Sequence, residues 1–435
     1  VANLNADGWT GVTLNEANDV DNLGGHSDTG SFSFTDLNGI NVGFVDVNNG
    51  INISTGGNII LSSGANVTQS GGAVLLTPPT GNLTVNASTG INLTEANIIP
   101  NVNLNNATSG DIIYDTNVPA LFVEATNAAA GNIDIANNSG SLIVNNAATG
   151  SGNITLYGSG NVNLAGTVLS SGNINVATGA SFINSFGAGV FPGSGNWLVW
   201  SGNPASDTRG GLVYDFKQYA ATYGTTTPSG TGNGFLYNIA PALTAGLTGS
   251  VAKTYDATTN AILAVGNYVV SGAIDGDTIT LNNPVGAYDN KNVGTGKTVT
   301  VNGLTTTATN GVATVYGYTV NSNANAAIGS ITPATLTTSG AAAQDKIYDT
   351  TTAATITGET LAGVLGSDVV NVSGDGTFAD ANAGAAKPVT AALILTGTDS
   401  GNYILTQPTG LTANITPAAL TITANNDAKT YDGLA

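Results

Sequence analysis

The chain contains 435 residues, of which only 8% are charged, and an excess of acidic over basic side chains gives it a net charge of −19. Residues 1–208 contain no lysine or arginine, which argues against nucleic-acid and anionic-membrane partners, because phosphate contacts require cations. The absence of cysteine removes disulfides, thiolate metal ligands and cysteine nucleophiles together.

The two ends of the chain lack the usual signals of a complete protein. There is no initiator methionine and no signal peptide, and the last residues fall just after the start of a repeated phrase at Lys429. Both ends are therefore expected to be cuts in a longer protein. No apolar run approaches the ~18 residues of a membrane span, so we expect no transmembrane segment.

Residues 49–176 repeat a phrase in which a Gly-Asn corner precedes alternating Ile, Val and Leu, with instances at Gly57, Gly81, Gly131, Gly152, Gly160 and Gly172. Alternation with period two places the aliphatic side chains on one face. Such short strands bury that face by stacking as coils about 4.8 Å apart. The spacing of about 20 residues predicts a right-handed parallel β-helix over residues 1–190, with asparagine ladders at its corners. A large β-sandwich is the alternative.

Residues 191–248 form a segment of different composition. The window 182–237 holds 11 of the 27 aromatic residues and the first two cations, Arg209 and Lys217. Because the end of a β-helix exposes unpaired strand edges, we interpret this segment as a cap or junction. The alternative is an aromatic platform for carbohydrate. The candidate cap or glycan contacts are Trp197, Trp200, Tyr214, Tyr219 and Tyr237.

A second repeat begins near residue 249 with a Lys-x-Tyr-Asp signature. Its three instances are Lys253, Tyr255 and Asp256, then Lys346, Tyr348 and Asp349, then Lys429, Tyr431 and Asp432. They define modules at 249–337 and 338–424 and the start of a third at 425–435, and in the first two Tyr288 aligns with Phe378. The pattern predicts tandem small β-sandwich or β-grasp-like domains. We expect the lysine to lie on the ring of the signature tyrosine and the motif to be structural.

These phrases together resemble the filamentous-haemagglutinin-like adhesins that Gram-negative bacteria export by two-partner secretion. The Gly-Asn-Ile coils resemble the β-helical shaft of that family, and the Lys-x-Tyr-Asp modules resemble its YDG surface repeats. The segment from Trp197 to Tyr237 is similar to the junction that often precedes such repeats, and Lys429 onward is similar to the start of an MBG-type repeat. No secretion domain is evident, so the export route rests on analogy.

Candidate catalytic and ligand-binding patterns are weak. His26, the single histidine, adjoins Ser27 and Asp28, but sequence neighbours rarely form a triad, and we interpret it as a turn residue. Residues 293–298, which include Lys297, are similar to the end of a P-loop, yet Lys291 stands where the first glycine of that motif should be. Asp275-Gly276-Asp277 is a possible Ca²⁺ ligand set without the full EF-hand pattern, and we favour turn carboxylates that bind no metal. No cofactor is expected.

These observations predict a non-enzymatic, extracellular protein: a rod-like bacterial surface adhesin or fibre component. The expected partners are copies of itself, or glycans and proteins of a host or neighbouring cell. One alternative is a filament or sheath subunit that polymerises head to tail. A second is a carbohydrate-binding β-helix protein that uses the aromatic segment.

Overall fold

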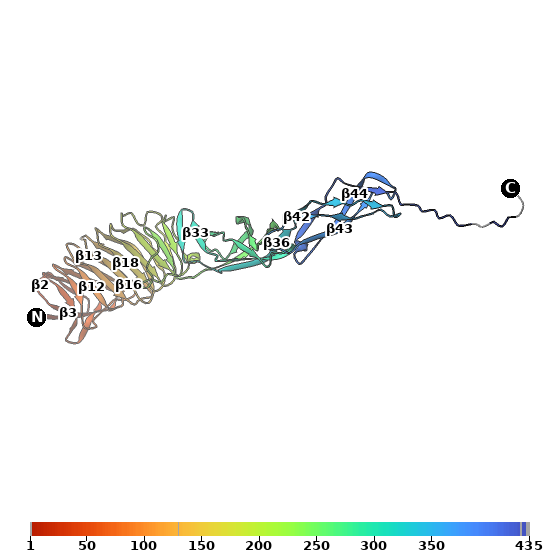
Figure 1. The fold of residues 1–435 in the computed structure, drawn as a ribbon. Coiled ribbons are helices and arrows are strands. Elements are labelled where there is room, and N and C mark those ends of the chain that lie inside the picture. Colours follow the sequence, from red (N-terminus) through yellow and green to blue (C-terminus); the bar gives the residue numbers. More distant parts are fainter. Residues whose placement is uncertain (1, 129, 427–428, 432–435) are drawn as a thin grey trace. The chain divides into compact units, whose positions relative to one another are not determined.

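The computed structural model describes residues 2–128, 130–426 and 429–431 (Figure 1). Strands account for 54% of the chain and helices for 2%, which confirms the predicted all-β class. The chain divides into two compact units. The first consists of Val1–Thr244, Val270–Leu281 and Thr305–Val320, and the second of Ala245–Val269, Asn282–Leu304 and Asn321–Ala435.

The first unit contains the predicted parallel β-helix, with about 11 turns. One face is built from β14 (Ile112–Thr116), β16 (Ile133–Asn137), β18 (Ile154–Gly158), β21 (Ile174–Thr178) and β23 (Trp197–Ser201), each parallel to the next. Their first residues, Ile112, Ile133, Ile154, Ile174 and Trp197, are paired in register and are all buried. The alternating aliphatic pattern therefore produces one continuous stacked core.

A second face runs through β11 (Asn82–Ala87), β13 (Asn101–Asn106), β15 (Ala120–Asn127), β17 (Ser141–Thr149), β19 (Val162–Leu164) and β22 (Phe182–Asn184), again with parallel pairing. The N-terminal coils follow the same rule, since β2 (Val12–Asn18) pairs with β4 (Phe32–Asp36) and β4 with β8 (Ile59–Ser63). Figure 1 shows these coils stacked side by side, with β13 and β18 among the labelled strands.

Contacts between successive coils explain the Gly-Asn corners. The side-chain oxygen of Asn132 accepts a hydrogen bond from the backbone N–H of Asn153 at 2.8 Å, and Asn153 accepts one from Asn173 at 2.9 Å. The predicted asparagine ladder is thus formed from side chain to backbone. Gly152 is needed for a steric reason, because a Cβ atom there would lie 2.0 Å from the carbonyl oxygen of Gly131.

A further set of asparagines points into the β-helix at strand ends. Asn137 is buried, and its amide nitrogen donates to the carbonyl oxygens of Val118 and Ser141 at 2.9 and 2.8 Å. Its side-chain oxygen accepts from the N–H of Val118 at 3.2 Å. Asn106 is buried in the same way. These side chains satisfy backbone groups that would otherwise be buried without a partner.

Parallel stacking continues through the aromatic segment. β23 pairs in parallel with β25 (Gly234–Tyr237), and β25 pairs with β24 (Phe216–Gln218). β24 pairs in turn with β34 (Ala313–Tyr316), which belongs to an antiparallel sheet with β33 (Thr306–Asn310) and β30 (Thr278–Leu281). Strands from much later in the sequence therefore cover an edge that would otherwise be unpaired.

The second unit contains two five-stranded sheets of the same design. One has the order β27 (Val251–Thr254), β36 (Asn323–Thr332), β32 (Gly294–Asn302), β31 (Gly286–Tyr288), β28 (Asn260–Ala261). The other has the order β39 (Lys346–Ile347), β46 (Leu411–Thr416), β44 (Gly384–Thr396), β43 (Asn371–Phe378), β40 (Ala353–Ala354). In both, the strand at the Lys-x-Tyr-Asp signature is parallel to the strand that ends in Ile-Thr just before a proline, and the other pairings are antiparallel. The later repeats thus form small β domains, as predicted.

None of the helices in the described ranges has the length and apolar character needed to span a bilayer.

Candidate functional site

The first candidate site is a buried ion-pair cluster at the end of the β-helix, which we call the Asp277 cluster (Lys217, Tyr219, Asp277 and Tyr318). Lys217 lies in β24 and Asp277 immediately before β30, and both side chains are 0% exposed with 2.5 Å between Nζ and Oδ1. The hydroxyls of Tyr219 and Tyr318 donate to Oδ2 of Asp277 at 2.7 and 3.0 Å. A charged carboxylate is therefore held by one ammonium group and two phenols.

A second ion pair adjoins this cluster. Asp275 accepts from Lys217 and from Arg209, each at 2.5 Å. Arg209 also donates to the hydroxyl of Tyr237 and lies 5.0 Å from the ring centroid of Phe235. Two cations thus balance two carboxylates in a largely buried site, which is the condition under which buried charges are tolerated.

The electrostatics keep these groups in their hydrogen-bonding forms. Burial raises the pKa of Tyr318 to about 12. Burial and the bond to Asp277 also raise the pKa of Tyr219 well above its usual value. Burial opposes ionisation of Asp275, but the hydrogen bonds from Lys217 and Arg209 hold its pKa below the usual value. The phenols therefore remain donors and Asp275 remains an acceptor across the physiological range.

The second unit contains a cluster of the same chemistry, which we call the Asp368 cluster (Tyr255, Lys291, Asp368 and Tyr403). Nζ of Lys291 lies 2.5 Å from Oδ1 of Asp368. Tyr255 and Tyr403 donate their hydroxyls to Oδ2 of Asp368 at 2.6 and 2.7 Å. Burial raises the pKa of Tyr403 to about 12. The bonds from Lys291 and the two tyrosines lower the pKa of Asp368 against the opposing effect of its burial.

The two clusters agree in detail. Their tyrosine pairs are both edge-to-face, with centroids 5.0 Å apart for Tyr219 and Tyr318 and 5.3 Å apart for Tyr255 and Tyr403. In each, the second tyrosine accepts from the backbone N–H three residues before the aspartate, at 2.9 and 3.0 Å. In each, the residue two positions before the aspartate has positive φ. Such agreement indicates one recurring junction rather than two unrelated ion pairs.

Each cluster is assembled from two parts of the chain. The repeat that contains the aspartate also supplies one tyrosine, and the part of the chain that precedes this repeat supplies the lysine and the other tyrosine. Asp277 and Tyr318 receive Lys217 and Tyr219 from the end of the β-helix. Asp368 and Tyr403 receive Tyr255 and Lys291 from the preceding repeat. The arrangement can therefore join consecutive β structures.

Within the Lys-x-Tyr-Asp signature, the lysine does not lie on the ring of the signature tyrosine as predicted, but on another ring of the same repeat. Lys253 pairs with Asp256 at 2.6 Å and lies 5.4 Å from the ring centroid of Tyr288. Lys346 likewise pairs with Asp349 and lies over the ring of Phe378, the residue aligned with Tyr288. The hydroxyl of the first signature tyrosine, Tyr255, instead donates to Asp368. Lys429 and Tyr431 of the third instance are described, whereas Asp432 lies outside the described residues.

The five predicted aromatic contacts lie at the end of the β-helix in different surroundings. Trp197 is buried against Phe235, at 5.2 Å between ring centroids. Tyr214 donates to Asn310, Tyr237 accepts from Arg209, and Tyr219 belongs to the Asp277 cluster. Four of the five side chains are therefore engaged by contacts within the chain. Trp200 lines a cavity.

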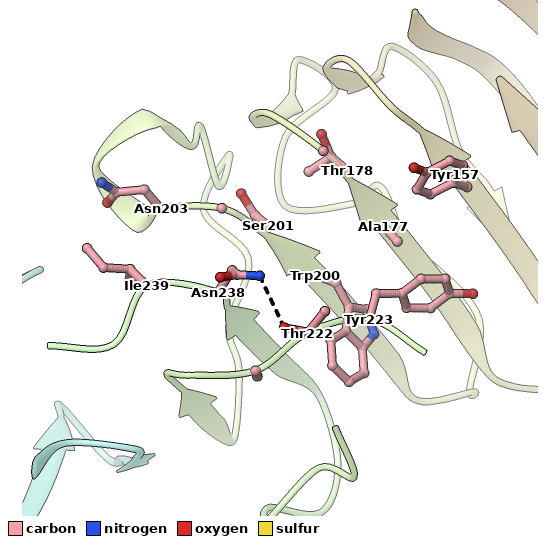
Figure 2. A pocket seen from close by; sticks show the side chains of 13 residues that line it. Tyr157, Ala177, Thr178, Trp200, Ser201, Asn203, Thr222, Tyr223, Asn238 and Ile239 are labelled. Carbon is pink, nitrogen blue, oxygen red and sulfur yellow. Dashed lines mark hydrogen bonds between the residues drawn. The ribbon is translucent and has the colours of Figure 1, made fainter. Parts of the chain in front are cut away.

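That cavity has a volume of about 780 Å³ and lies beside β23 (Figure 2). Trp200 and Tyr223 pack edge-to-face on its wall, with 5.6 Å between centroids. The amide of Asn238 donates to the hydroxyl of Thr222 at 3.1 Å, as the dashed line in Figure 2 shows. The buried indole N–H of Trp200 has no hydrogen-bond partner among the described residues. An aromatic wall with convergent neutral polar groups suits a small, uncharged polar ligand.

The carboxylates proposed for calcium have other partners. Asp275 and Asp277 are paired with protein cations, so a metal ion would have to displace Arg209 and Lys217. Within the described ranges no group of three or more His, Cys, Asp or Glu side chains is placed to hold a metal ion.

From the sequence, Asp277 was considered only as a possible Ca²⁺ ligand, and Asp368 was not singled out. A usable signal exists, because Gly272-Ala-Ile-Asp-Gly-Asp277 and Gly363-Val-Leu-Gly-Ser-Asp368 are parallel phrases in the two repeats. The shared aspartate follows a glycine by five residues in a segment with few other charges. The partners of this aspartate could not be assigned from the sequence, because Tyr219 lies 58 residues from Asp277.

Comparison with known families bears on the repeats. Residues 240–326 and 332–410 each match the YDG domain, so each match contains one of the two cluster aspartates, Asp277 or Asp368. Searches of curated proteins and of solved structures gave no match. The fold and these matches define a β-solenoid protein that carries two YDG domains.

Proposed function

We propose that the protein is a non-enzymatic structural and adhesive component of a bacterial cell surface, in which the β-solenoid and the YDG domains present a contact surface. The observation that carries the proposal is the recurring aspartate cluster. A device that joins each β structure to the one before it serves a protein whose task is to hold position, and catalysis has no need for such repetition.

The engagement of the polar side chains also supports this proposal. Ser27 donates its hydroxyl to the carbonyl oxygens of Thr29 and Gly30 and does not pair with His26. Ser54 Oγ and Asp28 Oδ1 both approach His26 Nε2, at 2.8 and 3.7 Å, whereas a triad uses the two different ring nitrogens. The buried carboxylate of Asp277 is engaged by cationic and phenolic donors, which argues against a proton-transfer role.

The proposal is tested by coating beads with the purified chain and washing them over bacterial and host-cell layers. We expect the coated beads to be retained, and we expect no soluble product from polysaccharides of those surfaces. Release of reducing ends or unsaturated sugars without bead retention would contradict the proposal. Electron microscopy of the same material would reveal ordered head-to-tail filaments if self-assembly is the primary activity.

A second candidate function, carbohydrate binding, is favoured by the Trp200 cavity. The ring pair Trp200–Tyr223 and the side chains of Asn238 and Thr222 offer stacking and neutral hydrogen bonds. We expect Trp200 fluorescence to shift on titration with a binding oligosaccharide and Tyr223→Ala to abolish the shift. Val213→Ala, at an exposed aromatic-segment position, is the control. An unchanged spectrum across a glycan array would contradict this candidate.

A further inference from the structure

We propose that the second YDG domain carries a docking surface for a further YDG domain, centred on Tyr348. The inference rests on the repetition of the aspartate cluster and is independent of which external surface the protein contacts. The observations are the equivalence of Tyr348 to Tyr255, the exposure of Tyr348, and an open cavity beside it.

Tyr348 is held in the same local frame as Tyr255. The backbone N–H of Tyr255 donates to the carbonyl of Thr332, and that of Tyr348 donates to the carbonyl of Thr416, both at 2.8 Å. The residue two positions later has positive φ in both cases, 63° at Ala257 and 69° at Thr350. The lysine and aspartate of the signature are paired on either side of each tyrosine. The second domain thus presents its tyrosine as the first domain does.

The two tyrosines differ in what covers them. Tyr255 is 3% exposed, and its hydroxyl donates to Asp368. Tyr348 is 40% exposed, and within the described part of the chain its hydroxyl makes no hydrogen bond. Its neighbour Ile347 is also largely exposed. Tyr348 therefore presents the tyrosine that a preceding domain supplies to an aspartate cluster, with the exposed aliphatic side chain of Ile347 beside it.

A cavity of about 460 Å³ adjoins this surface, lined by Ala383, Gly384, Ala385, Asn414, Ile415, Thr416 and Pro417. The aligned loop of the first domain is occupied by the second domain. There the N–H of Val293 donates to the side-chain oxygen of Asn402 at 2.9 Å, and Lys291 approaches Asp399 at 3.5 Å. The open cavity therefore lies where the first domain receives its successor.

The repeated geometry specifies the partner. It must carry an unengaged aspartate and a tyrosine in the positions of Asp368 and Tyr403, as a further YDG domain would. A second copy of this chain does not fit, because Asp277 and Asp368 are already bound by their own tyrosines and lysines. Ala381 stands at the position aligned with Lys291. The cluster proposed at Tyr348 would therefore contain the phenol of Tyr348 but no lysine.

The test uses the full chain with residues 418–435 replaced by a second copy of residues 334–417, and the probe is nitration of tyrosine by tetranitromethane, read by peptide mass spectrometry. We expect Tyr348 to react about tenfold more slowly in the extended chain than in the original chain. The added domain would cover the ring, and the hydroxyl would be held by one hydrogen bond to a charged carboxylate. Tyr255 should be protected in both. Replacing the copied aspartate by asparagine should restore most of the reactivity, and Ala381→Lys should increase the protection.

A second extension, with a copy of residues 242–333, guards against a misfolded addition. Protection of the added domain's own counterpart of Tyr318 or Tyr403 reports that it has folded. Equal reactivity of Tyr348 in the original chain and in both extended chains would overturn the proposal.

Discussion

At the scale of single residues, Lys217 is the most unusual side chain in the protein. It is fully buried in β24 and shared between Asp275 and Asp277 at 2.5 Å each. Buried ion pairs add little net stability over apolar packing, but they penalise any arrangement that leaves one charge unpaired. Lys217 therefore favours packing of the segments around Asp277 and Tyr318 on the end of the β-helix over packing of any segment that brings no carboxylate.

The first prediction concerns Asp277. Asp277→Asn should destabilise the first unit by about 3 kcal/mol, because it leaves Lys217 buried with one carboxylate in place of two. Denaturant unfolding followed by tryptophan fluorescence measures this effect. Asp28→Asn makes the same charge change at a side chain that is 41% exposed, and it should change stability by less than about 0.5 kcal/mol. Equal effects of the two substitutions would contradict the role of the cluster.

The second prediction is the pH dependence of the Asp368 cluster. The pKa of Asp368 is lowered in the folded chain, so its contribution is present above the unfolded pKa of about 3.9 and is lost as pH falls below that value. The pKa of Tyr403 is raised to about 12, so its contribution is present below about pH 10 and is lost as pH rises toward 12.

Hydrogen exchange of the segment around Asp368, measured from pH 3 to pH 11 and corrected for intrinsic rates, should therefore show constant protection between about pH 5 and pH 9 and a fall on each side. Tyr403→Phe should remove part of the alkaline fall and leave the acid fall in place. A profile that Tyr403→Phe leaves unaltered would show that this phenol does not contribute.

At the scale of elements, the β-helix could be predicted well from the sequence because its coils are local. The Gly131, Gly152 and Gly172 phrases place buried isoleucines in register at Ile133, Ile154 and Ile174. The asparagine ladder was also anticipated. The inward asparagines such as Asn137 were not, because at a strand end an inward and an outward asparagine look alike in the sequence.

The third prediction tests the coil corner. Gly152→Ala should destabilise the β-helix by about 1–3 kcal/mol, since the added methyl group would meet the carbonyl oxygen of Gly131 at 2.0 Å. Gly189→Ala is the control, because its nearest neighbour is a ring atom of Phe186 at 3.8 Å and its φ is not positive. Circular dichroism during thermal unfolding compares the two. A Gly152→Ala chain as stable as the Gly189→Ala chain would contradict this account of the corner.

The YDG repeats show where sequence reasoning stops. Their boundaries are visible in repeated phrases, yet Val270–Leu281 and Thr305–Val320 pack with the β-helix while the rest of that repeat belongs to the second unit. Pairing between β24 and β34 joins residues about 100 apart. No local pattern encodes such a contact, and without it the lysine, tyrosine and aspartate of the cluster cannot be assigned to one another.

At the scale of the whole molecule, consecutive β structures are joined by one repeated cluster, an arrangement that suits the proposed role as a surface component that must resist separation. The first cluster combines the end of the β-helix with the first YDG match, and the second combines the two matches. A continuous aliphatic core stabilises the β-helix, whereas the clusters act where elements meet.

The most direct test of this account is single-molecule force spectroscopy of the full chain held by its two ends. We expect Asp277→Asn and Asp368→Asn each to lower the force of a different unfolding event, and Asp28→Asn to lower none. Unchanged unfolding forces in both cluster variants would contradict the claim that these clusters hold the protein together.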